Sequence, residues 1–121
     1  MPNDKFQLNA KSVLLTYPKA GFPLFEYLAW ARTLPNFMYG TVSSELHEDN
    51  SPHRHALLQF SKPIRSRDPK VFDYKGFHPN IQGARSPAAS KTYVQKDGNF
   101  LDLLTGRYAV KVADVCNGKL P

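Results

Sequence analysis

The segment that most constrains the fold lies near the middle of the chain. Residues 48–52 (EDNSP) include Asp, Asn, Ser and Pro, which favour turns. The runs on either side, 39–47 and 53–60, have the composition of β-strands. The sequence therefore predicts two antiparallel strands joined by a short turn, a β-hairpin.

A strand and a helix are predicted before this hairpin. Apolar and polar residues alternate over 6–10, and the β-rich run 12–17 stops at Pro18, so the first element is a strand. Residues 24–34 carry apolar side chains at near-helical spacing and are followed by Pro35. This pattern predicts an amphipathic helix.

The second predicted helix has nearly complete end signals. Ser86 is a favoured N-cap, and Pro87 suits the first helical position. Gly98 suits the stop, so the body of the helix is predicted over 88–97. A last strand is predicted over 100–105.

The order of these elements predicts an α+β domain, in which helices flank an antiparallel β-sheet. The basic stretch 61–80 is predicted as an ordered but irregular excursion, and 106–121 is interpreted as an ambiguous tail. With 121 residues the chain is long enough for one hydrophobic core and too short for two. We therefore expect 1–121 to be a single domain.

Amino-acid composition indicates which class of partner the protein binds and which compartment it suits. The net charge of +6, from 16 Lys and Arg against 10 Asp and Glu, suits a face that binds a polyanion. Cys116 is the single cysteine, which excludes an internal disulfide and a Cys-based zinc site and fits a reducing compartment. No apolar run approaches membrane-spanning length and the first residues do not form a secretory signal, so we expect no membrane partner.

Two histidines of the hairpin are candidate metal ligands. Side chains two apart on a strand share a face, so His53 and His55 project together. With 48–52 as the loop, Glu45 lies opposite His55, and His47 lies opposite His53. One carboxylate and two imidazoles suit Mn²⁺ or Mg²⁺ in phosphate chemistry, and zinc also accepts them. Glu45 and His47 compete as third ligand, since a register shift of two residues exchanges them.

A candidate nucleophile lies in the second predicted helix. Tyr93, Lys96 and Asp97 are three and four residues apart and share one helix face. A neutral phenol is a poor nucleophile, but an adjacent ammonium stabilises both the phenolate and the charge on an attacked phosphate. Lys96 is placed to do both. Asp97 is either a further metal ligand or a carboxylate at the helix end.

Taken together, these segments resemble the rolling-circle replication initiators, or Rep proteins, of the geminiviruses and genomoviruses within the HUH endonuclease superfamily. The motifs match in order: LLTYP at 14–18, ELHE at 45–48 with PHRH at 52–55, and YVQKDG at 93–98. Two segments resemble an additional family segment thought to support DNA binding and domain structure: FD at 72–73 and FHPNIQ at 77–82.

The resemblance implies an RRM/ferredoxin-like HUH endonuclease fold and a set of residue roles. The metal ligands that it implies are Glu45, His53 and His55, with Asp97 as a possible extra one. It also implies Tyr93 as the nucleophile and Lys96 as the phosphate-stabilising residue. One position departs from the pattern, because Arg54 stands where the family usually has a hydrophobic residue. We expect its stem to lie along apolar surface with its head in water.

Basic and aromatic side chains outside the metal motif are expected to contact DNA through phosphates and base stacking. The candidates are Lys11, Thr16, Tyr17, Arg65, Arg67, Lys70 and Lys75. Tyr17 is equally consistent with a place in the core.

The implied reaction is sequence-specific nicking of single-stranded DNA at the stem-loop origin of a circular viral genome. It leaves 5′-phosphotyrosyl DNA and a 3′-hydroxyl that primes rolling-circle synthesis, and the strand is later rejoined. The family's proteins continue into an oligomerisation segment and a helicase domain, and the sequence has no phosphate-binding loop motif. Self-association is expected through such C-terminal regions, and the expected setting is the host nucleus.

The alternative from another class is a non-catalytic RRM-like module that binds single-stranded nucleic acid and needs no metal. The predicted strand 53–60 lacks the glycine and aromatic pattern of the RNP1 signature, which favours the endonuclease.

Overall fold

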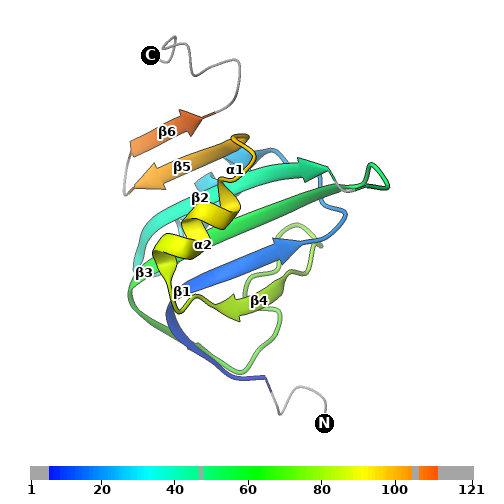
Figure 1. Ribbon diagram of the computed structural model, residues 1–121. Coiled ribbons are helices and arrows are strands. Elements are labelled where there is room, and N and C mark those ends of the chain that lie inside the picture. The colour runs from blue at the N-terminus through cyan, green and yellow to red at the C-terminus, as the bar shows by residue number, and fades with distance from the viewer. Residues whose placement is uncertain (1–5, 47, 105–106, 112–121) are drawn as a thin grey trace.

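The computed structural model describes residues 6–46, 48–104 and 107–111, and its strands form a single antiparallel sheet (Figure 1). The elements in chain order are β1 (Leu8–Tyr17), α1 (Leu24–Ala31), β2 (Phe37–Leu46), β3 (Pro52–Ser66), β4 (Asn80–Gly83), α2 (Pro87–Val94), β5 (Phe100–Leu104) and β6 (Arg107–Lys111). The six strands are ordered β4-β1-β3-β2-β5-β6. The predicted α+β fold with an antiparallel sheet is confirmed. In the described part, no helix is long and apolar enough to span a membrane.

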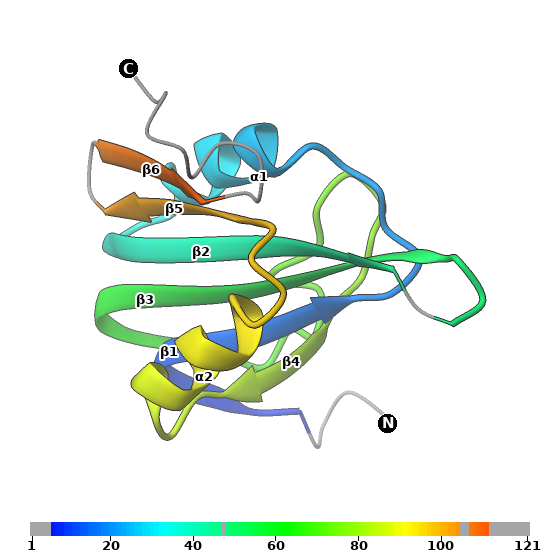
Figure 2. The same cartoon turned by 45° about the horizontal axis from the view of Figure 1, so that its top comes forward.

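The two helices cover opposite faces of the sheet (Figures 1 and 2). The face under α1 is apolar, and Leu28 packs there in one cluster with Val42 and Leu58. The face under α2 carries polar side chains, since Thr41 and His55 point toward it and contact residues of the α2 segment. Because successive side chains along a strand point to opposite faces, the face under α1 packs the core and the face under α2 carries the candidate site residues.

The first helix ends earlier than predicted. The apolar pattern over 24–34 predicted a helix up to Pro35, but α1 ends at Ala31. The backbone amide of Thr33 donates to Trp30 O, and the Thr33 hydroxyl donates to the same carbonyl at 2.6 Å. A side chain that takes a helix carbonyl competes with helix continuation, so tight turns replace the predicted last turn.

The second helix begins as predicted and also ends early. Ser86 is the N-cap and its hydroxyl accepts from Ala89 N at 3.3 Å. The helix ends at Val94 rather than at 97, because Lys96 N donates to Tyr93 O in a tighter turn. Gly98 closes this turn with φ of +74°, which glycine adopts without strain.

The stretch 61–80 is more regular than predicted, because β3 continues to Ser66 and pairs again with the start of β1. Ala10 pairs with Ile64 whereas Ser12 pairs with Gln59, so the register shifts between these two pairs. Pro63 lies within the shift, where its missing N–H costs no ladder hydrogen bond to β1. Strand β6 lies in the segment that the sequence left ambiguous.

Tyr17 is a core residue, and its prediction as a DNA contact is wrong. Its side chain is fully buried, and its hydroxyl donates to Phe72 O at 2.7 Å. The same hydroxyl lies 2.9 Å from the Tyr27 hydroxyl, inside a cluster of edge-on aromatic rings. Burial raises the pKa of Tyr17 well above its ordinary value, so the phenol stays neutral in the core.

Replacing Tyr17 by Phe removes this hydroxyl and leaves two buried polar groups without their partner. We expect a loss of about 1–3 kcal/mol in the free energy of unfolding, measured by urea denaturation. Tyr93→Phe is the matched control, because the Tyr93 side chain is 43% exposed. The control should change stability by less than about 0.5 kcal/mol. Equal stability of Tyr17→Phe and the wild type would contradict the account of the core.

Candidate active site

The hairpin of β2 and β3 sets the geometry of the site, and its register differs from the prediction. Glu45 pairs with His53 and Ser43 pairs with His55, two residues away from the predicted pairing of Glu45 with His55. The histidines still share one face with Glu45. His47, the alternative third ligand, lies outside the described residues.

The register follows from the hydrogen bonds of the turn. Ser51 donates to Asp49 Oδ1 through its backbone amide at 2.9 Å and through its hydroxyl at 2.5 Å. Asn50 between them adopts φ of +65°, which asparagine tolerates. These contacts draw the turn closed before Pro52, which becomes the first residue of β3 and pairs with Leu46. In Figure 2 the hairpin extends past the end of the sheet.

Three side chains of the hairpin region, Glu45, His53 and His55, lie on the face under α2. The Nε2 atom of His55 lies 3.5 Å from Glu45 Oε1, and His55 is almost fully buried. The Nδ1 atom of His55 lies 3.4 Å from the Thr16 hydroxyl on β1. His53 is also buried, and its Nε2 lies 3.0 Å from the Ser51 hydroxyl. Each ring thus has a hydroxyl neighbour that orients it.

Tyr93 and Lys96 complete this group from the other end of the sequence. The rings of Tyr93 and His55 meet edge to face, with centroids 5.3 Å apart. The Lys96 Nζ lies 4.3 Å from the centroid of the Tyr93 ring and donates to Glu45 Oε2 at 2.5 Å. The structure therefore brings the tyrosine segment and the histidine hairpin into one site.

The charge on Lys96 is stabilised by its neighbours. Partial burial lowers the pKa of Lys96, but the hydrogen bond and charge of Glu45, with smaller contributions from Tyr93 and Asp97, raise it above its ordinary value overall. The ammonium therefore stays protonated at neutral pH. Asp97 lies in the turn after α2, outside the predicted helix face, and its side chain is exposed. Within the described residues it contacts neither histidine.

The donor set fits a divalent cation in its chemistry. One carboxylate and two imidazoles on the same face are ligands that Mn²⁺ and Mg²⁺ accept while substrate oxygens fill other positions. Across the described ranges, no three His, Cys, Asp or Glu side chains already surround a common point. Lys96 contacts Oε2 of Glu45 whereas Oε1 faces His55, so a cation bound through Oε1 leaves the lysine contact in place.

Arg54 lies on the opposite face of the hairpin, and its head, expected in water, is partly buried. Its Nε donates to Phe22 O at 2.9 Å, and its Nη1 donates to the Ser44 hydroxyl at 2.8 Å. The guanidinium also lies 5.8 Å from the centroid of the Phe22 ring. Burial lowers the pKa of Arg54, but hydrogen bonds and the ring replace part of its hydration. Arg54 therefore joins the metal-motif strand to the loop before α1.

The predicted DNA contacts other than Tyr17 are spread over the molecule. Thr16 alone among them contacts the site, through His55. Arg65 lies at the other end of β3, where it pairs with Asn9, roughly 23 Å along β1 from the partner of His55 at the rise of an extended strand, and Arg67 follows β3. Lys75 pairs with Glu26 of α1 at 3.3 Å, on the far side of the sheet from Tyr93. Exposed side chains are also found at Lys11 and Lys70.

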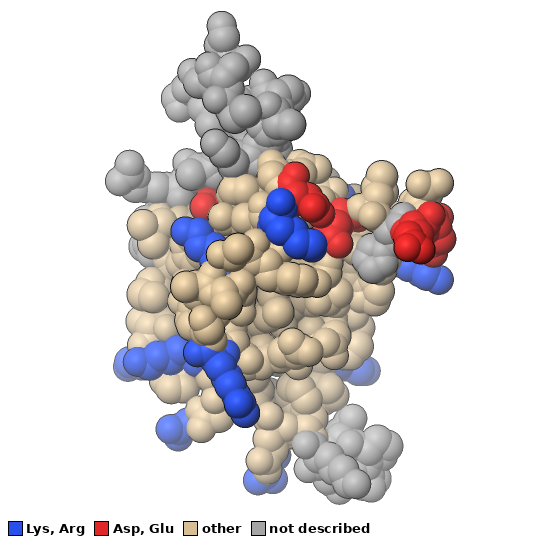
Figure 3. Space-filling model, in the orientation of Figure 1, with Lys and Arg blue, Asp and Glu red and all other residues tan. Residues whose placement is uncertain are grey.

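Charge is distributed unevenly on the face that carries α2 (Figure 3). Lys and Arg project along its lower part, whereas Asp and Glu gather toward the hairpin end, with a basic side chain beside them. Lys11 and Arg85 line one hollow on the basic part. This arrangement suits a polyanion that approaches the site from the basic side.

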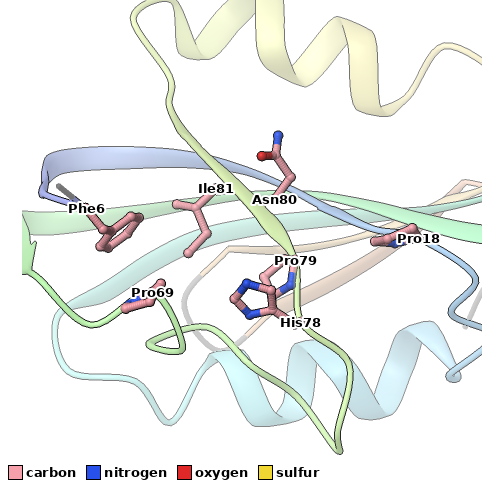
Figure 4. Close-up of a pocket in the computed structure, with 7 residues that line it drawn as sticks. All are labelled: Phe6, Pro18, Pro69, His78, Pro79, Asn80 and Ile81. Carbon is pink, nitrogen blue, oxygen red and sulfur yellow. The ribbon is translucent and has the colours of Figure 1, made fainter. Parts of the chain in front are cut away.

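A second pocket of about 400 Å³ lies at the β4 edge of the sheet (Figure 4). It is lined by Phe6, Pro18, Pro69, His78, Pro79, Asn80 and Ile81. The His78 Nδ1 lies 2.6 Å from Asp73 Oδ1. Asn80 pairs with Thr16, which pairs with His55, so part of the additional family segment lies two strands from the site.

Two contributors to the site were missed in the sequence. Ser51 was taken only as a turn former, although its hydroxyl lies against both Asp49 and His53. Gln95 was quoted only as part of the YVQKDG motif and was given no role, although its amide joins the α2 segment to the sheet. Its place in that motif, between Tyr93 and Lys96, is the signal that could have indicated a role at the site.

The chain is similar in sequence to one protein family and to individual viral proteins. The family model described as Geminivirus Rep catalytic domain matches residues 6–111. Replication-associated protein A of Bean yellow dwarf virus is 44% identical over 99 residues, which cover 78% of this chain and 34% of that protein. Replication-associated protein of the same virus is also 44% identical over 99 residues, which cover 78% of this chain and 29% of that protein. The chain thus spans about a third of the length of these relatives.

The donor set predicts which histidines matter for cation binding. His53→Ala and His55→Ala should each weaken Mn²⁺ binding at least about tenfold in calorimetric titration, because each removes an imidazole from the shared face. Glu45→Ala should weaken it more than His47→Ala does. His78→Ala is the matched control, since this histidine pairs with Asp73 away from the site. Wild-type affinity in both site variants would exclude this donor set.

Proposed function

Since the chain belongs to the family of geminivirus Rep catalytic domains, we propose that it cleaves and rejoins single-stranded DNA with Tyr93 as nucleophile. One observation carries the proposal. The Lys96 ammonium contacts both the Tyr93 ring and the Glu45 carboxylate, so nucleophile, positive charge and histidine hairpin form a single group. Phosphoryl transfer to a protein nucleophile is favoured by a positioned nucleophile and by nearby positive charge that stabilises the attacked phosphate.

In the proposed reaction the Tyr93 hydroxyl loses its proton and its oxygen attacks the scissile phosphorus in line. The bond between phosphorus and the 3′-oxygen breaks, and that oxygen takes up a proton. The products are a 5′-phosphotyrosyl DNA and a free 3′-hydroxyl. Lys96 stabilises the negative charge that develops on the phosphate oxygens. With 43% of its side chain exposed, Tyr93 is open to an incoming strand.

Glu45, His53 and His55 would hold a Mn²⁺ or Mg²⁺ ion, with Asp97 as a possible extra ligand. When bound, such an ion polarises the phosphate and withdraws charge from it. The chain's own contribution is orientation, since Thr16 and Ser51 hold the two imidazoles and Lys96 keeps its charge beside the phenol.

The covalent product keeps the energy of the phosphodiester bond, so a later 3′-hydroxyl can attack the tyrosyl ester and rejoin the strand. Cleavage and joining are then one reaction in two directions. The relatives are named replication-associated proteins. From the resemblance of the motifs to Rep proteins, we propose a stem-loop origin of a circular viral genome as substrate, with the freed 3′ end priming rolling-circle synthesis. Self-association of the longer protein and action in the host nucleus belong to the same proposal.

The nucleophile is tested by Tyr93→Phe, which keeps the aromatic ring and removes only the hydroxyl. This variant should bind DNA and Mn²⁺ with near wild-type affinity but form neither nicked product nor adduct on a denaturing gel. Adduct formation at the wild-type rate would show that another residue attacks. Metal-independent binding without any cleavage by the wild type would favour the non-catalytic binder.

Removing the lysine tests the electrostatic part of the proposal. Lys96→Ala should slow adduct formation by about a hundredfold without abolishing it, because the nucleophile remains in place. Lys91→Ala is the matched control, since Lys91 is a cation of α2 that lies over the Tyr39 ring instead. Equal rates for the two variants in single-turnover assays would remove Lys96 from the mechanism.

A further inference from the structure

The helix that carries the nucleophile is attached to the sheet by few apolar contacts. It has eight residues, and Val94 is its only buried side chain among those described. Tyr93 itself is 43% exposed, and its ring contacts the His55 ring edge to face. A two-turn helix gains little stability on its own, so its position depends on contacts made with the sheet. Because Val94 is the single buried apolar side chain of α2 among those described, apolar packing alone leaves the rotation of the helix on the sheet weakly determined.

Gln95, the residue between Val94 and Lys96, supplies polar contacts at this place. Its Nε2 donates to Asp102 Oδ1 at 2.8 Å and to the Thr41 hydroxyl at 3.1 Å. A longer contact of 3.4 Å reaches the Tyr39 hydroxyl. These acceptors come from two neighbouring strands, β2 and β5, so the amide is held from several directions.

The strands hold these acceptors ready for an amide donor. Thr41 pairs directly with Asp102, so their side chains lie side by side on the face under α2. The Tyr39 hydroxyl donates to the same Asp102 oxygen at 3.1 Å. Burial, followed by the charge of Asp102, raises the pKa of Tyr39, so this phenol remains a donor. The carboxylate requires that Gln95 present its NH₂ group, because the amide oxygen would meet a like charge.

We infer that Gln95 is a positioning residue for the nucleophile: its hydrogen bonds to Asp102 and Thr41 fix the end of α2, and with it Tyr93, against the sheet. Tyr93 lies two residues before Gln95 and Lys96 lies one residue after it. A displacement of the helix end therefore moves both the attacking oxygen and the stabilising charge relative to Glu45 and His55. The inference rests on the proposed role of Tyr93.

The test exchanges the hydrogen-bond donor and acceptor between Gln95 and Asp102 through substitutions that barely change side-chain size. Gln95→Glu places a carboxylate against Asp102 and should slow single-turnover adduct formation about ten- to a hundredfold, with DNA affinity and melting temperature near wild type. Asp102→Asn alone should have little effect, because its amide oxygen still accepts from Gln95. The double variant should recover most of the rate, since the amide introduced on β5 donates to the carboxylate introduced after α2.

Two further variants complete the design. Gln95→Met keeps the length without the amide and should also slow adduct formation about tenfold or more, which provides a test if Gln95→Glu does not fold. Gln59→Glu is the matched control, because Gln59 lies on the same sheet face but contacts Ser12 instead. This control should react at the wild-type rate.

The outcomes separate the inference from the proposed function. A wild-type protein that forms the Tyr93 adduct while Gln95→Met reacts at the same rate would overturn the role of Gln95 alone. A slow Gln95→Glu variant that Asp102→Asn does not rescue would also overturn it, as would equal losses of rate, affinity and melting temperature. Absence of the adduct in the wild type would instead overturn the proposed function.

Discussion

The ion pair between Lys96 and Glu45 joins two parts of the chain separated by 51 residues, and the rest of the site depends on it. Glu45 belongs to the central hairpin, whereas Lys96 follows the short helix that carries Tyr93. Because the ammonium also lies over the Tyr93 ring, one charge contacts the nucleophile and the carboxylate together. Catalysis of phosphoryl transfer relies mainly on positioning and on electrostatic stabilisation. Held by Glu45, the Lys96 ammonium supplies a positive charge in a fixed position beside Tyr93.

The two faces of the sheet have different roles, because one packs the hydrophobic core and the other carries the candidate site. On one face, α1 and the aromatic cluster around Tyr17 form the core, and Arg54 joins the hairpin to the preceding loop on that side. On the other face, His53 and His55 alternate with those packing residues, and His55 meets the ring of Tyr93. The period of two along β3 thus allows tight packing and a polar, accessible site within the same strand.

Much of this arrangement could be predicted because it depends on local rules. The turn formers between two β-rich runs predicted the hairpin, and Ser86 predicted the start of the second helix. The register could not be predicted, because side-chain hydrogen bonds of Ser51 to Asp49 decide where the turn closes. The surroundings of Arg54 depend on Phe22, a contact between distant residues that no pattern indicates. Side-chain hydrogen bonds within the turn and a contact between distant residues thus separate the predicted from the observed site.

The central claim is that Tyr93 becomes covalently attached to the 5′ side of a cleaved strand, and tandem mass spectrometry of the wild-type protein tests it most directly. The protein would be incubated with a single-stranded origin oligonucleotide and Mn²⁺, digested with nuclease and protease, and its modified peptides fragmented. The account predicts a nucleotide phosphate on the phenolic oxygen of Tyr93. The same mass increment on a different residue, or cleavage that leaves every peptide unmodified, would contradict it.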